Sequence, residues 1–354
     1  MFERCSAESS CTFRGFMFHS GLTNSSSKGA KATEVLLLSR GEIEKLLTMG
    51  DVLRAVQKAF KLQAEGKAIM PPKLYLDLPE YEGDFRAMPA YSNGSVGIKW
   101  VSVYPNNWRH GLPCVMATIA LCDPKTGCLL GVMDGTYITS MRTGAAGGIA
   151  VQYLARRDSS VIGIIGAGTQ ARTQLQAISQ VLPRIEEVKV FDLRRDASQG
   201  FCAEMGAKLH INVHPVETVE EATQADVLVT ATPSRVPFVK KRHIRPGTHI
   251  NAIGADAPGK QELETDVLKN AKIVVDDIEQ ASHSGEINVP LSEGLIRVEE
   301  IYGTLGEVVA GIKKGRENGQ EITVFDSTGL AIQDVACAKL VYNRAKEKGL
   351  GIGL

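Results

Sequence analysis

The sequence predicts an α/β protein with two domains, one built on a doubly wound parallel sheet and the other of α+β type. Strands and helical patterns alternate between residues 159 and 277, which requires crossover connections and therefore a parallel sheet. A glycine-rich turn joins the first strand of this region to its first helix. Before it, short strands separated by turn residues are typical of an antiparallel sheet.

The chain becomes regular at Glu34, where the elements of the α+β domain begin. Residues 35–38 form a strand-like apolar run, and Ser39 is placed to cap the helix that follows. A second helix is expected to begin at Asp51, because apolar residues recur there at helical spacing. Further strands are expected at residues 73–78, 85–90, 97–104, 115–122 and 128–134, followed by a helix over 140–154.

Strands of the parallel sheet are expected at residues 161–165, 188–191, 227–231, 249–253 and 273–275. The last segment of the chain contains a strand at 322–326 and a helix at about 330–346. Because a terminal helix needs a surface to pack on, we expect the chain to return there to the first domain. The predicted division assigns residues 34–150 and 321–354 to the α+β domain, and residues 151–320 to the parallel sheet and its helices.

Bulk composition excludes several classes of function. The 354 residues include 40 Lys plus Arg and 40 Asp plus Glu, so no net charge attracts nucleic acid or an anionic membrane. No apolar run is long enough to span a bilayer. The seven cysteines are odd in number and lack metal-ligand spacing, which favours structural thiols, no metal and a cytoplasmic location. Residues 1–33 have no helical or strand period, and we expect a disordered extension.

The strongest motif is GAGTQA at residues 166–171, directly after the strand 161–165. Gly166 permits a tight turn, Gly168 lets the backbone approach a pyrophosphate, and Ala171 allows the helix to pack closely on the sheet. The pyrophosphate then lies at a helix N-terminus, where free N–H groups favour negative charge. The motif in this context predicts a Rossmann NAD-binding domain.

Asp192 ends the next strand, where a carboxylate can bind the ribose hydroxyls of the cofactor. Its charge repels the additional phosphate of NADP, which favours NAD. Arg194 and Arg195 follow directly, however, and guanidinium groups bind phosphate well. The sequence therefore leaves a strict preference for NAD over NADP open.

Three cations of the α+β domain are candidates for holding an anionic substrate or moving protons. Lys73 follows two prolines, Arg86 lies in a strand, and Lys99 lies inside an apolar strand, where burial should depress its pKa. Each is also explained as a solvated strand residue. Arg142 lies among small residues near a predicted helix start, where it either binds phosphate or forms an ordinary ion pair.

Asp256 follows the strand 249–253, at the edge of the sheet where ligands of doubly wound folds gather. A carboxylate at this position, followed by Pro and Gly, is a candidate base. Capping of a following helix is the alternative interpretation of the same residue.

Together these residues resemble the ornithine cyclodeaminase and mu-crystallin family, from about Glu34 to the C-terminus. The matching segments are MPPK at 70–73, RAMPA at 86–90, MDGT at 133–136 with Arg142, GAGTQA at 166–171, NAIGADAPGK at 251–260, GEIN at 285–288 and VFDSTG at 324–329. Within the family the chain is most similar to archaeal-type alanine dehydrogenases, in residues 254–260 and 326–334.

The resemblance implies a homodimer whose first domains pair their sheets, with one NAD site in each subunit. It implies that Lys73 binds the substrate carboxylate, that Lys99 transfers protons, and that Asp256 handles water or ammonia. Arg142 would contact the cofactor phosphates or the substrate carboxylate. Positions that contact the cofactor in the family align with Thr169, Gln170, Asp192, Ile253, Gly254, Lys260 and Ser327.

We therefore expect reversible oxidative deamination of L-alanine to pyruvate and ammonia with NAD, the carboxylate being held by Lys73 and Arg86. Ornithine cyclodeaminases carry a glutamate for the distal amine where this sequence has Arg86, which weakens that alternative. A cyclic ketimine or pyrroline-2-carboxylate reductase uses the same clamp and hydride step. A mu-crystallin-like binding protein is the non-enzymatic alternative. Pocket fit does not rank these small substrates from sequence.

Overall fold

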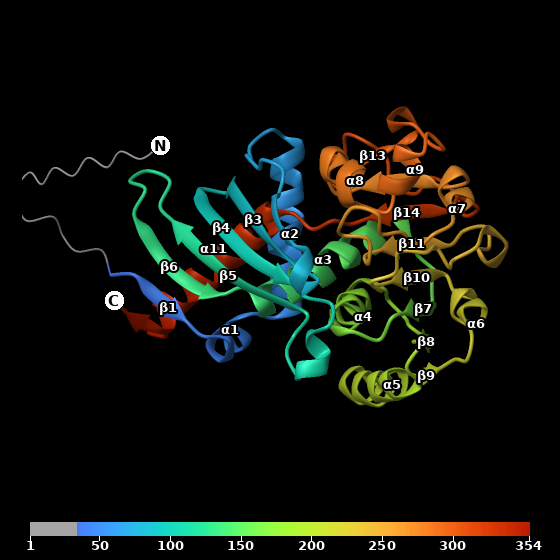
Figure 1. The fold of residues 1–354 in the computed structure, drawn as a ribbon, viewed down its shortest axis with the longest axis horizontal. Coiled ribbons are helices and arrows are strands. Elements are labelled where there is room, and N and C mark those ends of the chain that lie inside the picture. Colours follow the sequence, from blue (N-terminus) through green and yellow to red (C-terminus); the bar gives the residue numbers. More distant parts are fainter. Residues whose placement is uncertain (1–33) are drawn as a thin grey trace, which may run out of the picture. The chain divides into compact units, whose positions relative to one another are not determined.

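The structure is a computed structural model that describes residues 34–354 (Figure 1). The extension expected at residues 1–33 lies outside the described residues. Two sheets organise the described chain. Within residues 34–354, no helix is both long enough and apolar enough to cross a bilayer.

The first sheet has seven strands in the order β15-β1-β6-β5-β4-β3-β2. The strands from β2 to β6 form an antiparallel meander, as the sequence predicts. The short N-terminal strand β1 adds to β6 in parallel, and the C-terminal strand β15 pairs with β1. The bounds are β1 Leu36–Leu38, β2 Leu74–Leu78, β3 Gly83–Ser92, β4 Ser95–Val103, β5 Val115–Cys122, β6 Leu129–Asp134 and β15 Ile352–Gly353.

Helices α1 (Arg40–Leu46), α2 (Met49–Ala64) and α11 (Ala331–Lys348) accompany this sheet, and α11 packs on β3, β4 and β5. Ser39 begins α1 with a reciprocal capping box, in which Glu42 binds the Ser39 backbone N–H. Helix α2 begins earlier than predicted, because Thr48 is its N-cap and accepts a hydrogen bond from the Asp51 N–H. Asp51 therefore lies in the first turn.

Helix α3 (Thr136–Leu154) lies between α2 and α4 and is almost entirely buried. It begins before the predicted Ser140, because Asp134 accepts hydrogen bonds from the Thr136 and Tyr137 N–H groups. Arg142 consequently lies well inside the helix rather than near its start. At Gly144 an added Cβ would lie 2.4 Å from the Thr173 carbonyl oxygen, so glycine is needed for the close approach of α4.

The second sheet has eight parallel strands in the order β13-β12-β14-β11-β10-β7-β8-β9, with helices on both faces (Figure 1). This arrangement confirms the predicted Rossmann-type sheet. The strands are β7 Val161–Ile165, β8 Glu187–Phe191, β9 Val213–Pro215, β10 Val227–Thr230, β11 His249–Ala252, β12 Lys272–Val275, β13 Gly303–Thr304 and β14 Thr323–Asp326. The helices are α4 Thr169–Val181, α5 Arg195–Leu209, α6 Val219–Thr223, α7 Thr265–Lys269, α8 Ile278–Ser284, α9 Asn288–Ser292 and α10 Leu305–Val309.

The strand at 322–326 does not begin the return to the first domain. It is β14, which pairs with β11 on one side and β12 on the other. All four of its residues are buried, as expected for a central strand covered by helices on both faces. The chain returns only after Asp326, through the segment that leads into α11. The remaining domain boundaries stay a prediction.

Candidate active site

The glycine turn after β7 has the geometry that a dinucleotide requires. Gly166 has φ +95°, and an added Cβ would lie 2.6 Å from the Ala231 carbonyl oxygen. Around Gly168 an added Cβ would meet no atom within 4 Å, so the backbone is open to a ligand. Gly168 is the N-cap of α4 and supplies no side-chain cap, which leaves the first N–H groups of the helix available to an anion.

Asp192 lies beside this turn at the carboxyl end of β8. Its Oδ2 accepts a hydrogen bond from the Ala167 N–H at 2.8 Å, and its Oδ1 accepts one from the Arg194 N–H at 2.9 Å. The carboxylate is thus fixed next to the glycine turn. This is where the sequence places it.

Two other predicted cofactor residues carry polar atoms that lack a hydrogen-bond partner within residues 34–354. These atoms are Gln170 Oε1 and Ser327 Oγ, and both are buried. An unpaired buried polar atom is costly, so its retention is typical of a site that a ligand completes. The residues present therefore fit a dinucleotide, with Ala171 fully buried under the turn and Thr169 exposed beside it.

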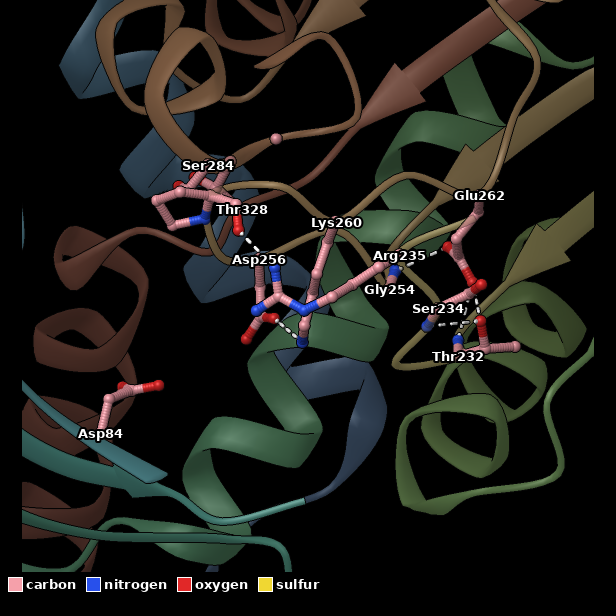
Figure 2. Close-up of polar contacts among 12 residues, drawn as sticks. Asp84, Thr232, Ser234, Arg235, Gly254, Asp256, Lys260, Glu262, Ser284 and Thr328 are labelled. Carbon is pink, nitrogen blue, oxygen red and sulfur yellow. Dashed lines mark hydrogen bonds and ion pairs between the residues drawn. The ribbon is translucent and has the colours of Figure 1, made fainter. Parts of the chain in front are cut away.

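Glu262 joins the two loops that follow β10 and β11 (Figure 2). Its Oε1 accepts hydrogen bonds from the Thr232 N–H at 2.8 Å and the Thr232 hydroxyl at 2.7 Å. Its Oε2 accepts one from the Gly254 N–H at 3.0 Å, directly after Ile253. The sequence analysis missed both Glu262 and Thr232. The carboxyl end of a predicted strand was a signal for Thr232, whereas nothing local marks Glu262.

Asp256 lies on the loop after β11 and binds two cations. Its Oδ1 accepts a hydrogen bond from Lys260 Nζ at 2.6 Å (Figure 2), and its Oδ2 accepts one from the Arg86 guanidinium at 3.0 Å. No helix begins at Asp256, which excludes the helix-capping interpretation, since α7 starts at Thr265. Burial disfavours its charge, but Lys260 and Arg86 together hold its pKa well below the usual range.

Arg86 is buried, and its guanidinium is shared between two carboxylates. Besides Asp256 it binds Asp84, with distances of 2.6 Å from Nε to Oδ1 and 3.1 Å from Nη2 to Oδ2. The guanidinium also lies over the Tyr75 ring. The ion pair with Asp256 joins β3 of the first sheet to the ligand-binding edge of the second.

Lys73 and Lys99 are also buried, so neither is the solvated strand residue that the sequence left as an alternative. Lys73 Nζ donates a hydrogen bond to the Thr328 carbonyl oxygen at 2.6 Å. Lys99 Nζ lies 2.8 Å from Asp334 Oδ2. Burial lowers the pKa of both lysines, nearby arginine charges add to the lowering and nearby carboxylates oppose it, so that the pKa of Lys73 is about 8 and that of Lys99 about 7.

Arg142 forms a buried ion pair with Asp334, at 3.0 Å from Nε to Oδ1. Its guanidinium also lies against Gly329, where an added Cβ would lie 2.3 Å from Nη1. The sequence left two interpretations of Arg142 open, phosphate binding and an ion pair. Among the described residues, Arg142 forms an ion pair. Asp334 brings Lys99 and Arg142 together, and the sequence analysis did not identify it.

A third missed carboxylate, Asp276, organises the turn to which Lys73 binds. It accepts hydrogen bonds from the Thr328 hydroxyl at 3.1 Å and the Gly329 N–H at 2.7 Å. Burial raises the pKa of Asp276 to about 6, although the charge of Lys73 opposes the shift. Asp276, which follows β12, thus holds the turn whose Thr328 carbonyl oxygen binds Lys73.

Two further acids, Asp326 and Glu286, are buried and form no ion pair with a cation among the described residues. Burial raises the pKa of Asp326 to about 8 and raises that of Glu286 well above its ordinary value. Glu286 Oε1 accepts hydrogen bonds from the Glu262 and Leu263 N–H groups, and Asp326 Oδ2 accepts one from the Ile287 N–H. Glu286 thus holds the backbone that carries Glu262, and Asp326 holds the backbone next to Glu286.

A parallel doubly wound sheet, an open glycine turn with a fixed acidic residue, and buried lysines near Asp256 define a Rossmann-fold dinucleotide-binding enzyme. The chain belongs to the ornithine cyclodeaminase/mu-crystallin family, which it matches over residues 33–349. The family expected from the sequence is therefore confirmed.

Relatives and solved structures show which members of this family the chain is similar to. The alanine dehydrogenase of Archaeoglobus fulgidus is 56% identical over 90% of this chain and 97% of its own length. An archaeal alanine dehydrogenase dimer with bound NAD has 55% identity and a TM-score of 0.87, covering 91% of this chain and 99% of that chain. The Δ1-pyrroline-2-carboxylate reductase of Thermococcus litoralis, in complex with NADH and L-proline, has 45% identity and a TM-score of 0.88, covering 90% and 100%.

Proposed function

We propose that this protein is an NAD-dependent alanine dehydrogenase, which catalyses the reversible oxidative deamination of L-alanine to pyruvate and ammonia. The observation that carries the proposal is the ion pair of Arg86 with Asp256, at 3.0 Å, which joins the cation-bearing sheet to the ligand-binding edge of the Rossmann sheet. The 56% identity to the Archaeoglobus fulgidus alanine dehydrogenase supports the substrate.

The cofactor is held by residues from both halves of the parallel sheet. Gly166, Gly168 and the N-terminus of α4 bind the pyrophosphate, and Asp192 binds the ribose. The remaining contacts come from the residues that align with cofactor positions, which are Thr169, Gln170, Ile253, Gly254, Lys260 and Ser327. When bound, NAD would supply the acceptor for the hydride that leaves the α-carbon of alanine.

The substrate carboxylate is bound by cations, and a lysine with a lowered pKa moves the proton. Lys73 and Arg86 bind the carboxylate, with Arg142 behind them. Lys99, whose pKa is about 7, gives a proton to the departing hydroxyl in the direction of amination and takes one in the direction of deamination. Asp256 stays ionised because its pKa is lowered, so it balances the positive iminium and orients water or ammonia.

A cyclic imine reductase is the second candidate, favoured by the 45% identity to the Thermococcus litoralis enzyme in complex with L-proline. The same cations suit either substrate, because both carry an α-carboxylate next to a C=N bond. A cyclodeaminase is disfavoured by Arg86, whose charge repels a second substrate ammonium. A pure binding protein does not require a buried lysine with a pKa near 7.

The outer face of the first sheet supports a homodimer. Four apolar residues alternate with inward residues along β2 and β4 and are partly exposed: Leu74 at 64%, Leu76 at 48%, Ile98 at 40% and Trp100 at 42%. Cross-strand register places Leu74 and Trp100 on either side of Ala87. An apolar sheet face of this kind is typical of a buried interface, and the similar archaeal alanine dehydrogenase is a dimer.

A cytoplasmic location belongs to the same proposal. The cysteines within residues 34–354 are all free thiols, and two of them are buried. Free thiols suit a reducing compartment.

The test is absorbance at the NADH wavelength, with purified protein and NAD, across L-alanine, L-proline, L-ornithine and L-lysine, together with pyruvate plus ammonium and NADH. Turnover of L-alanine, and of pyruvate plus ammonium, establishes the dehydrogenase. Turnover of proline alone assigns the imine reductase. Release of proline and ammonia from ornithine without net NADH would overturn the proposal in favour of a cyclodeaminase.

A further inference from the structure

The two arginines that follow Asp192 decide which dinucleotide the site accepts. The extra phosphate of NADP is attached to the ribose that the acidic residue of a Rossmann fold binds. A site accepts that phosphate when a free guanidinium neutralises it. Arg194 and Arg195 are next to Asp192 in the chain, so the positions of their side chains determine the outcome.

Arg194 is engaged by an aromatic ring on the connection between β4 and β5 of the first sheet. Its guanidinium carbon lies 5.4 Å from the centroid of the Trp108 ring. Trp108 lies in the short 3-10 helix Asn107–His110, between β4 and β5, and it also carries the guanidinium of Arg109 at 5.5 Å. The indole thus stacks with two cations. The connection brings a residue from the first sheet to the segment that follows Asp192.

Arg195 is engaged by a carboxylate. Its Nη2 lies 2.8 Å from Glu217 Oε1, on the loop that follows β9. Asp192 itself is held by the Ala167 and Arg194 N–H groups, so its carboxylate remains in place and is not neutralised by either guanidinium in the described structure.

We propose that Trp108 and Glu217 make the site selective for NAD, by engaging the two guanidinium groups that would otherwise neutralise the 2′-phosphate of NADP. The proposal builds on the NAD site proposed above. Trp108 and Glu217 are not among the residues that we propose to bind the substrate or move protons, so they act on cofactor choice. Both are exposed at the surface, so their removal leaves the core intact.

The expected effect of each contact is modest because both are exposed to solvent. An exposed cation–π contact or ion pair contributes about 0.5–1 kcal/mol, which corresponds to about a twofold to fivefold change in affinity. Releasing both arginines should therefore tighten NADPH binding about fivefold to twentyfold. NADH binding should change by less than about twofold, because NADH has no phosphate at that ribose.

The test is a fluorescence titration of the protein with NADH and, separately, with NADPH, which needs no substrate. The variants are Trp108→Ala, Glu217→Gln and the double variant, with Trp108→Phe as the control that keeps an aromatic face. The double variant is then repeated with Arg194→Ala and Arg195→Ala added, and with Arg109→Ala added. Thermal unfolding followed by circular dichroism checks that each variant is folded.

The expected result is that the wild type prefers NADH, that the double variant gains NADPH affinity, and that the gain is lost with Arg194 and Arg195. Trp108→Phe should keep the wild-type preference. A wild type that binds NADPH as tightly as NADH overturns the proposal. So does a gain that is absent, or one that persists without the two arginines. A wild type that binds neither dinucleotide would instead overturn the proposed function.

Discussion

Lys99 Nζ lies 2.8 Å from Asp334 Oδ2, and both side chains are only 1% exposed. The same carboxylate holds Arg142 at 3.0 Å. Two cations therefore share one anion in a buried environment. Burial and the charge of Arg142 lower the pKa of Lys99, Asp334 raises it in part, and the balance lies at about 7.

Lys99 should set the pH dependence of L-alanine oxidation. The reaction needs neutral Lys99 to accept a proton, and Lys99 becomes neutral as the pH rises through about 7. The kcat at saturating L-alanine should therefore rise through this range and level off above it. Lys99→Met should lower kcat by about 10²–10⁴-fold, the usual contribution of a general acid or base, and should abolish the pH limb. Exposed Lys67→Met is the matched control. A Lys99→Met variant with normal kcat would remove the proposed role.

Asp334→Asn should move that pH limb to lower pH. Asp334 favours the charged form of Lys99, so removing its charge lowers the pKa of Lys99 below about 7. The measurement is the kcat–pH profile between pH 5 and 9, compared with that of Asp77→Asn, a variant of an exposed residue in β2. A purely structural role for Asp334 predicts a lower kcat at every pH without displacement of the limb.

Lys73→Met should raise the KM for L-alanine. A charge-assisted hydrogen bond to a carboxylate contributes about 1.5–3 kcal/mol, which corresponds to about a tenfold to 150-fold change. The KM for NAD should change little, because Lys73 directly precedes β2 of the first sheet and is not among the proposed NAD contacts. Initial rates with varied L-alanine and varied NAD separate the two. An unchanged KM for alanine would show that Lys73 only holds the turn at Thr328.

The sequence predicts the cofactor half of the site better than the substrate half, and the reason is the distance between partners along the chain. Gly166, Gly168 and Asp192 belong to one local strand–helix–strand unit made of β7, α4 and β8, so their spacing in the sequence marks them as candidates. Asp334 reaches Lys99 only because α11 packs on β4. Such a contact depends on where the chain returns to the first domain. The sequence analysis placed this return before the strand at 322–326, whereas the chain returns after that strand, which is β14 of the second sheet.

The distance between partners along the chain also explains why the sequence analysis missed Asp276 and Glu262. Asp276 contacts Thr328 across 52 residues, and Glu262 reaches Thr232 across 30. Their carboxylates look like surface charges in the sequence, because no periodic pattern distinguishes a buried acid that binds backbone N–H groups. The short strands β9 and β13 were missed for a different reason, since two or three residues carry too little pattern.

Glu262→Gln should weaken cofactor binding more than it slows catalysis. A glutamine has one acceptor oxygen, so it cannot bind both Thr232 and Gly254, and the loops after β10 and β11 lose their connection. The KM for NAD should rise about tenfold to 150-fold, the cost of one charge-assisted hydrogen bond, with kcat within about threefold. Exposed Glu293→Gln is the control. Equal loss in kcat and no change in the KM for NAD would contradict this role.

Asp326→Asn should stabilise the protein at neutral and alkaline pH. The pKa of Asp326 is raised from its ordinary value near 3.8 to about 8, so the folded state binds a proton that the unfolded state has lost in this window. Wild-type stability therefore falls as the pH rises from about 4 to about 8, by an amount on the order of a few kcal/mol. Asparagine has no such charge. Urea unfolding at pH 4.5, 6, 7 and 8.5 should show a difference that grows with pH, whereas exposed Asp158→Asn should show none.

Trp100→Glu should separate the proposed dimer. Trp100 is 42% exposed on β4 and stacks on Phe85 with ring centroids 5.4 Å apart, so it forms part of the open apolar face. A buried, unpaired carboxylate at an interface costs several kcal/mol, which is enough to shift the assembly toward single subunits at micromolar concentration. Sedimentation velocity across a concentration series measures the shift, and Trp108→Glu on the exposed connection is the control. A dimer that persists unchanged in Trp100→Glu would place the interface on another face, because a charge at this position is incompatible with sheet-on-sheet packing.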